Sequence, residues 1–360
     1  MLSKVIFSFF SGSGFLDLGF ENAGFDVVFV NEIEKAFIGA YEHSRKIMGH
    51  SKPKYGYHEN SIDDYLTSDE ACYLSECVNL EKKSGNIVGF IGGPPCPDFS
   101  VGGKNKGRDG ENGRLSQSYV DCIRRNEPDW FVFENVKGLW KTKKHREFYE
   151  KLKLELIDAG YLIFDRLINS LEFAVPQDRE RVIMFGVKSD SLVKKSPFDW
   201  EKYMKYPNGI AFDFNWPTTS TFKSDLDFPI GIPEELTVQY WFEKNGVASH
   251  PNANAYFTPR AGLAKFLLIN EGDTSKKSYK RLHRHRYSPT AAYGNNEVHL
   301  HPTEARRLSA AEALAIQSLP KEFEFPKTMT LSSMFKTIGN GVPYLFSFGI
   351  ASSIKDYLEL

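Results

Sequence analysis

The sequence predicts an α/β fold built on a mostly parallel sheet flanked by helices, and three observations lead to this prediction. Short apolar runs of strand length recur at residues 4–10, 27–30 and 86–92. A glycine turn and a segment with helical spacing follow the first run, as at the entry of a βαβ unit. Chemically reactive residues come directly after later strands, where open α/β sheets bind their ligands.

Composition is that of a soluble globular protein with a sizeable core. The 360 residues suffice for one large or two medium domains, and 41% hydrophobic and 25% charged residues are ordinary values. No apolar run approaches the ~20 residues of a membrane span, and the N-terminus is typical of a strand rather than a signal peptide. Four cysteines without a CxxC pair argue against zinc and disulfides and predict a cytoplasmic setting. Because the net charge is −1, any nucleic-acid surface must be local.

The N-terminal strand, turn and helix are typical of a nucleotide-binding unit. Glycines in the turn at 11–15 let the backbone approach a ligand, and the N-terminus of the following helix favours polar or anionic groups. Asp17 stands where the third glycine of a GxGxxG motif would be, which weakens a dinucleotide interpretation. Glu32 follows the strand at 27–30, where an acidic residue suits the hydroxyls of a ribose; the alternative is a solvated carboxylate.

Cys96 is the candidate nucleophile. It follows the buried strand at 86–92 and a Gly-Gly-Pro-Pro turn, so its thiol sits just beyond a strand end on a rigid backbone. The alternative is a buried structural cysteine. The glycine-rich segment 100–114 carries several basic residues and predicts a mobile lid beside the thiol, or else a solvated loop.

The middle of the chain continues the α/β pattern. A strand at 130–133 ends at Glu134, which puts a second reactive group at a strand end. Apolar spacing predicts a helix over 147–159, and two further strands are expected at 161–168 and 181–187.

The pattern changes after Val187. Residues 188–300 are rich in proline, aromatics and turn residues, which predicts an inserted second domain of irregular, partly β structure. Its basic residues cluster at 276–286, as in a phosphate-binding patch, although a solvated loop could have the same composition. Regular patterning resumes with a helix at 309–317, and a glycine turn at 338–343 leads into a final apolar helix.

Six motifs, in this order, resemble those of the DNA (cytosine-5) methyltransferase family. They are FFSGSGF at 9–15, PPCPDFS at 94–100, ENV at 134–136, QDRERVIMFGV at 177–187, RRLSAAEALAIQSLP at 306–320 and IGNGVP at 338–343. The resemblance implies the Rossmann-like fold of an S-adenosylmethionine-dependent methyltransferase with a smaller inserted target-recognition domain. The implied parts are a catalytic and cofactor-binding large domain at 1–187, the target-recognition small domain at 188–300, and a return to the large domain at 301–360, whose C-terminal helix completes the cofactor pocket.

The resemblance further implies a sequence-specific enzyme that transfers methyl from S-adenosyl-L-methionine to C5 of a cytosine, with S-adenosyl-L-homocysteine as product. The Cys96 thiolate would add to C6 of the base. Glu134 would hydrogen-bond N3 and the 4-amino group, and Arg181, supported by Arg179, would donate to O2. Since these groups cannot reach a stacked base, the cytosine must flip out of the duplex.

The expected binding residues come from these motifs, from other positions of the family pattern, from the glycine-rich segment 100–114 and from the basic cluster at 276–286. Those expected at the cofactor are Phe10, Gly12, Ser13, Gly14, Phe15, Glu32, Ile33, Ser61, Ile62, Gly93, Pro95, Leu115, Asn340, Gly341 and Val342. Those expected on DNA are Ser100, Lys104, Lys106, Arg108, Lys276, Lys277, Lys280, Arg281, Arg284 and Arg286. No metal is expected.

Four positions depart from the family pattern. Pro97 follows the cysteine where glutamine is usual, and Ala311 replaces an arginine. Ile33 replaces a ring-stacking tryptophan and Ser61 an aspartate that receives the adenine amino group, so the adenine pocket is the least defined part of the site.

The expected partner is double-stranded DNA, bound by a monomer in the bacterial cytoplasm without a membrane. A cognate restriction endonuclease acting on the same site is a candidate companion. Two alternatives share the fold: a tRNA cytosine-5 methyltransferase, disfavoured by the sizeable basic insert, and a non-catalytic DNA-binding regulator, disfavoured because Cys96, Glu134 and Arg181 are all present. A nicotinamide-dependent dehydrogenase has no use for a cysteine and a glutamate at two strand ends. The recognition sequence cannot be read from these residues.

Overall fold

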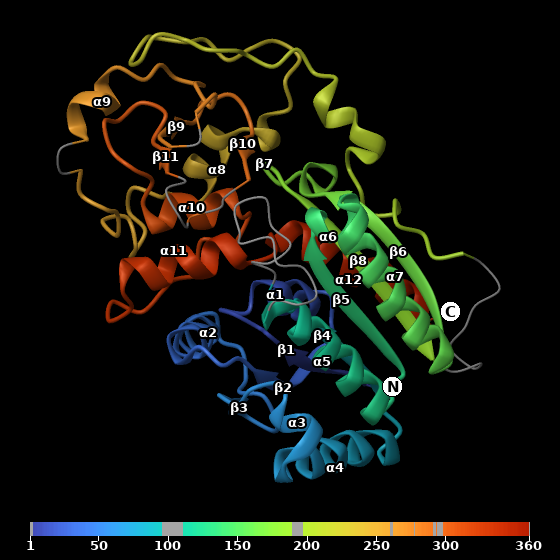
Figure 1. Cartoon of the computed structure of the whole chain (residues 1–360). Helices are drawn as coiled ribbons and strands as arrows, with labels where there is room; N and C mark the ends of the chain where they lie inside the picture. The colour runs from blue at the N-terminus through green and yellow to red at the C-terminus, as the bar shows by residue number, and fades with distance from the viewer. Residues whose placement is uncertain are drawn as a thin grey trace.

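A seven-stranded sheet lies at the centre of the large domain (Figure 1). The structure, a computed structural model, describes residues 3–95, 111–188, 197–259, 262–276, 278–290, 293 and 298–359, and of residues 111 and 112 only the backbone. The strand order is β3-β2-β1-β4-β5-β8-β6. The bounds are β1 Lys4–Phe9, β2 Asp26–Asn31, β3 Tyr57–His58, β4 Ile87–Gly92, β5 Trp130–Val136, β6 Tyr161–Asn169 and β8 Glu180–Lys188.

The sheet is mostly parallel, as predicted. Strands β1 to β5 pair in parallel, and β8 lies antiparallel between β5 and β6. In the β5–β8 register Glu134 is opposite Ile183, and Val136 is opposite Arg181. Glu134 and Arg181 are therefore diagonal neighbours on one face of the sheet. The register alone brings two of the predicted catalytic residues together.

Helices cover both faces of the sheet. Their bounds are α1 Phe15–Asn22, α2 Lys35–Ile47, α3 Asp64–Thr67, α4 Asp69–Lys83, α5 Glu111–Asn126, α6 Lys137–Lys141, α7 Lys143–Asp158 and α12 Tyr344–Glu359. One core cluster contains Leu74 of α4, Tyr119 of α5 and Leu152 of α7. The opposite cluster contains Phe20 of α1 and Ile350 of α12, so the C-terminal helix packs beside the first helix.

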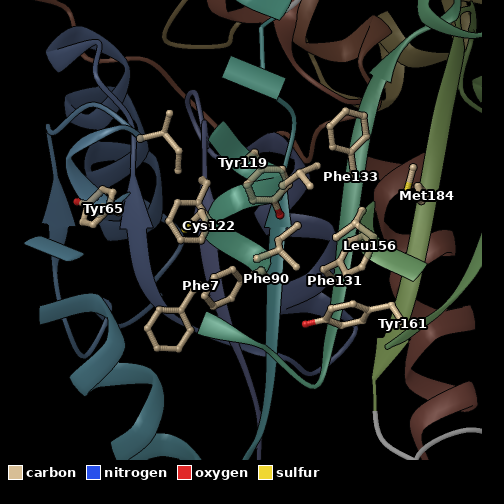
Figure 2. Close-up of a cluster of buried hydrophobic side chains, with 14 of the residues drawn as sticks. Phe7, Tyr65, Phe90, Tyr119, Cys122, Phe131, Phe133, Leu156, Tyr161 and Met184 are labelled. Atoms are coloured by element: carbon tan, nitrogen blue, oxygen red, sulfur yellow. The ribbon is translucent and has the colours of Figure 1, made fainter. Parts of the chain in front are cut away.

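Aromatic rings dominate the first of these clusters (Figure 2). Phe7 and Phe90, from neighbouring strands, have ring centroids 5.6 Å apart, and Phe131 contacts Tyr161 edge-on at 5.0 Å. Cys122 of α5 lies among them, and burial raises the pKa of its thiol to about 12. This cysteine is a small apolar part of the core rather than a reactive group.

The insert is irregular, as expected for 188–300. Its elements are η3 Pro207–Phe212, η4 Glu234–Leu236, α8 Val238–Lys244, α9 Leu263–Leu267, β9 Lys280–Arg281, β10 Ser288–Pro289 and β11 His299–Leu300. Strand β10 pairs in parallel with β7, Gln177–Asp178, which connects the insert to the segment just before β8. The 3₁₀ helix η2, Ser170–Phe173, precedes β7.

Two helices follow the insert, α10 Ala310–Ile316 and α11 Leu331–Asn340. Ala315 and Ile316 of α10 share a core cluster with Trp241 and Phe242 of α8. Residues just after 300 thus pack on the insert as well as on the large domain, and the domain boundaries stay a prediction.

Sequence reasoning left several helices unassigned, among them α2, α4, α5 and α11, and it counted residues 111–114, the start of α5, as part of the predicted lid. It also placed the start of α7 at 147, although the helix begins at Lys143. The first turn of α7 is basic and carries no apolar repeat, so periodicity gave no signal there. Within the described residues, no helix is long and apolar enough to cross a membrane.

Candidate active site

Glu134 and Arg181 form a buried ion pair at the end of β5. Arg181 Nε donates to Glu134 Oε1 at 3.0 Å, and the two side chains are only 11% and 10% exposed. Burial raises the pKa of the Glu134 carboxyl, while Arg181 and Arg179 oppose the rise. A carboxyl that holds its proton more tightly than an exposed glutamate is suited to donate a hydrogen bond to a bound base.

The turn after β4 lies directly against this pair. A Cβ on Gly93 would come within 2.7 Å of Glu134 Oε2, so any larger residue here would displace the Glu134 carboxyl. Asn135 Nδ2 donates to the Pro94 carbonyl at 3.3 Å and holds the turn to the end of β5. Pro95 follows, and the predicted nucleophile comes next in the chain. The structure therefore brings the approach to Cys96 beside Glu134.

Several predicted residues lie outside the described residues. They are Cys96, Pro97, Ser100, Lys104, Lys106, Arg108 and Lys277.

Arg179 joins the catalytic segment to the end of α11. It is 1% exposed, and its Nη2 donates to the carbonyls of Gly339 at 2.9 Å and Asn340 at 3.4 Å. Gln317 Nε2 donates to the adjacent Ile338 carbonyl at 2.6 Å. These side chains satisfy carbonyls that a helix end leaves without intrahelical partners. Arg179 thus fixes the predicted cofactor residue Asn340 relative to the catalytic strand.

The glycine turn and Glu32 meet at the ends of β1 and β2. Glu32 Oε2 accepts the Gly12 N–H at 2.9 Å, and Oε1 accepts the Glu34 N–H at the same distance. Burial raises the pKa of the Glu32 carboxyl. Ile33, beside it, is 63% exposed although it is a large apolar residue. The arrangement pairs an acidic group with an uncovered apolar face, as a ribose and an attached base require.

The first and last motifs are in contact although they lie at opposite ends of the chain. Ser13 Oγ and Thr337 Oγ1 are 2.9 Å apart. A Cβ on Gly341 would come within 2.2 Å of the Phe15 ring, which explains the glycine after α11. Val342, next in the chain, is buried. The structure thus brings together the N-terminal and C-terminal residues predicted for the cofactor.

Phe10 has a positive φ of 52°, a conformation that non-glycine residues rarely adopt. Its ring contacts Tyr119 edge-on at 6.1 Å. Backbone strain of this kind costs about 1–3 kcal/mol and persists where the surrounding structure enforces it. The strained residue opens the same turn that carries Gly12 and Gly14.

The predicted adenine-pocket residues lie near α3 and α5. The Ser61 N–H donates to Asp64 Oδ2 at 3.0 Å, and Ile62 is buried in the core. Leu115 of α5 packs on the same core from the side. Asp63 accepts from Ser118 Oγ of α5 at 2.6 Å. The carboxyl groups of Asp63 and Asp64, which lie next to Ser61, are thus both engaged in hydrogen bonds within the protein.

The prediction that Arg281 contacts DNA does not fit its placement. The side chain is fully buried, and its guanidinium donates to the carbonyls of Phe266, Ile269, His301 and Glu304 at 2.5 to 2.8 Å. A side chain held by four carbonyls in the interior cannot reach a duplex. Charge density in a sequence does not distinguish such an internal arginine from a surface one, because both raise the local count of basic residues.

The other described basic residues of the cluster differ in accessibility. Arg284 binds the fully buried Glu271 through both Nε at 2.9 Å and Nη2 at 2.8 Å, and Arg286 donates to the Pro217 carbonyl at 3.3 Å. Lys276 is exposed and Lys280 is half-buried. The lysines are therefore better placed than the arginines to meet a phosphate.

Sequence reasoning missed a buried polar network behind the glycine turn. Asp17 accepts from Ser8 Oγ at 2.9 Å and from Tyr41 OH at 3.0 Å, and burial raises its pKa to about 6. Arg45 of α2 donates to the Gly14 carbonyl at 2.6 Å and to Glu21 Oε2 at 2.7 Å. The one signal available was Asp17 itself, which replaces a glycine of the turn motif because its carboxyl belongs to this network.

Among the described residues, no group of three histidine, cysteine, aspartate or glutamate side chains is placed to hold a metal ion.

The chain is similar in sequence and in fold to known methyltransferases. The family model described as C-5 cytosine-specific DNA methylase matches residues 5–356. Type II methyltransferase M.NmeDI of Neisseria meningitidis serogroup C is 61% identical over 355 residues, which cover 99% of this chain and 84% of that protein. Type II methyltransferase M.FnuDI of Fusobacterium nucleatum is 30% identical over 363 residues, covering 98% and 94%. The solved structure of S. pombe Dnmt2 methyltransferase has the same fold, with a TM-score of 0.63 at 13% identity over 99% of this chain and 100% of that chain.

Proposed function

The chain belongs to the family of C-5 cytosine-specific DNA methylases, and we propose that this DNA (cytosine-5) methyltransferase works through a covalent adduct between Cys96 and its target cytosine. The observation that carries the proposal is the buried pair of Glu134 and Arg181, set against the turn that leads to Cys96. Cytosine C5 is a poor nucleophile, and a thiolate that adds at C6 turns the ring into an enamine with a nucleophilic C5.

Glu134 and Arg181 would stabilise the charge that this addition creates. Electron density moves to N3 as the thiolate adds, and the Glu134 carboxyl would donate a hydrogen bond to N3. The raised pKa of Glu134 supports this role, because it favours the protonated form. Arg181 would donate to O2 and hold the ring in the plane of the pair. After transfer, water would remove the C5 proton and the thiol would leave.

The residues around the glycine turn fit S-adenosylmethionine, which supplies an electrophilic methyl group when bound. Glu32 would hold the ribose hydroxyls, since its carboxylate is buried at the end of β2 beside Gly12. The exposed side chain of Ile33 would cover one face of the adenine. Asn340, fixed by Arg179, would close the pocket from the other end of the chain.

Double-stranded DNA would bind across the insert and the segment after Cys96. Base flipping is required because the groups that act on the ring lie at buried strand ends. DNA contacts are also proposed for Ser100, Lys104, Lys106 and Arg108, which lie outside the described residues. Lys276, Lys277 and Lys280 would meet phosphates, and Arg284 and Arg286 would reach the duplex only by leaving their internal contacts.

A restriction-modification role is proposed from the relatives. The two curated proteins compared above are named type II methyltransferases. A cognate restriction endonuclease would then cut the same sequence, and this enzyme would act as a monomer in the cytoplasm, where the DNA is.

Bisulfite sequencing of DNA from cells that express the protein tests the proposed function. One methylated cytosine within one short sequence context is the expected result, and the Glu134→Gln enzyme should leave that context unmethylated. Methyl transfer to tRNA with none to duplex DNA would overturn the proposal.

A further inference from the structure

The turn that would hold the cofactor has an unusual backbone that needs support. Phe10, Gly12 and Gly14 all have positive φ, at 52°, 58° and 77°. Gly12 and Gly14 adopt this region without a steric cost, whereas Phe10 does so only where neighbouring groups hold it. Glu32 holds the Gly12 N–H, and the Gly14 N–H donates to the Ser11 carbonyl at 2.9 Å. The Gly14 carbonyl, which ends the turn, accepts the Leu18 N–H at 3.0 Å at the start of α1 and is also held by a side chain from α2.

Arg45 is the side chain that holds this carbonyl. It is 1% exposed, and Nη2 donates to the Gly14 oxygen at 2.6 Å while Nε donates to Glu21 Oε2 at 2.7 Å. Its guanidinium carbon lies 4.3 Å from the centre of the Tyr41 ring. A Cβ on Gly14 would meet that ring at 2.4 Å and Arg45 Nη2 at 2.9 Å. The turn therefore rests directly on Tyr41 and Arg45.

We propose that Arg45 is a positioning residue for the cofactor, because its hydrogen bond to the Gly14 carbonyl fixes the glycine turn in the conformation that binds S-adenosylmethionine. The inference rests on the proposed function of this turn. Arg45 does not touch the cofactor in this account, and it acts only through the Gly14 peptide. A buried guanidinium with two fixed acceptors has little freedom, so it can hold the peptide in one orientation.

The test must separate the bond to Gly14 from the ion pair with Glu21. Removing Arg45 alone would leave the Glu21 carboxylate in a largely buried place without its cation, which destabilises a fold. The informative variant is therefore the double substitution Arg45→Met with Glu21→Gln, which removes both charges and the bond to Gly14. The matched control is Glu21→Gln alone, since a glutamine oxygen can still accept from Arg45 and the bond to Gly14 stays.

Calorimetry with S-adenosylmethionine and with S-adenosylhomocysteine provides the direct readout. The double variant should bind both about tenfold more weakly than wild type, the scale of one hydrogen bond from a charged donor, and Glu21→Gln should bind within about twofold. Steady-state kinetics should show a raised KM for the cofactor with kcat near wild type at saturation and an unchanged KM for DNA. Arg45→Lys with Glu21→Gln should recover part of the affinity, because an ammonium can donate to the Gly14 carbonyl.

Wild-type cofactor affinity in the double variant would overturn the proposal, as would a lower kcat with an unchanged cofactor KM, which indicates a loss of folded enzyme only. A wild-type protein that binds no S-adenosylmethionine would contradict the proposed function instead, so the two failures are distinguishable.

Discussion

At the scale of single residues, burial makes the Glu134 carboxyl hold its proton more tightly than an exposed glutamate does. It sits at a strand end, opposed by Arg181 and touched by the Gly93 backbone, and its pKa is raised by burial. A glutamate near the end of β5 could be predicted from the ENV motif, because β5 is readable as a strand. The pair of Glu134 and Arg181 depends on the antiparallel register of β5 and β8, which cannot be predicted from the sequence.

Glu134→Gln tests the role of the carboxyl as an acid, because an amide can donate a hydrogen bond to N3 but cannot transfer a proton to it. The amide oxygen can still accept from Arg181 Nε, so the fold and cofactor binding should be preserved. Turnover should fall by about 10²–10⁴-fold, the usual contribution of a positioned acid. Single-turnover methylation of duplex DNA measures the rate, and calorimetry with S-adenosylmethionine serves as the control. A rate within about threefold of wild type would remove Glu134 from the chemistry.

Residue burial also separates the basic residues of the insert. Arg281→Met should destabilise the protein by about 2 kcal/mol or more, since four buried or partly buried carbonyls lose their donor. Lys276→Ala should leave the free energy of unfolding unchanged and lower the salt slope of DNA binding by about one unit, as expected for one phosphate contact. Denaturant unfolding would measure the first effect and salt-dependent DNA binding the second. A loss of stability in Lys276→Ala, with wild-type stability and a lower salt slope in Arg281→Met, would contradict the structure.

At the scale of elements, strands were easier to predict than helices. Apolar runs such as those of β1, β4 and β5 are buried on both faces, so the strands are visible in the sequence, although β5 continues to Val136, beyond the predicted 130–133. Helices α4 and α5 carry many charged or polar residues on their outer faces, and only a narrow buried face marks them. The basic start of α7 buries only His145 and has no apolar repeat.

The junction of β1, α1 and α2 predicts a pH dependence of stability. Burial raises the pKa of Asp17 to about 6, and Arg45, Glu21, Ser8 and Tyr41 are the groups that face it. The unfolded value is about 4, so folding binds a proton between pH ~4 and ~6. The stabilising contribution of protonated Asp17 is therefore fully present below pH ~4 and lost as the pH rises through ~6.

Asp17→Asn removes this titration. The unfolding free energy of the variant minus that of wild type should rise between pH ~4 and ~6 and then level off, by at most about 3 kcal/mol for two pKa units. Urea unfolding at several pH values measures the difference. A difference that stays constant over this range would show that Asp17 does not titrate as the structure predicts.

At the scale of the whole molecule, some contacts between distant parts of the chain could be predicted from the sequence and others could not. The family motifs predict that the last motif returns to the first, and the contacts of Ser13 with Thr337 and of Phe15 with Gly341 agree with this. Arg45 could not be predicted as a support of the site, and Arg179 was expected beside Arg181 rather than on the carbonyls of Gly339 and Asn340, because a buried arginine has no local sequence pattern. Its partners are backbone carbonyls whose positions depend on the complete fold.

The central claim is that Cys96 attacks a cytosine held beside Glu134 and Arg181. Incubation with S-adenosylmethionine and duplex DNA in which 5-fluorocytosine replaces cytosine tests it most directly, because fluorine cannot leave as a proton does and the adduct is trapped. We predict a denaturation-resistant complex whose DNA-linked peptide contains Cys96, and no complex with Cys96→Ser, whose hydroxyl ionises too weakly to add at C6. A trapped complex linked through another residue, or methylation by Cys96→Ser at the wild-type rate, would contradict the account.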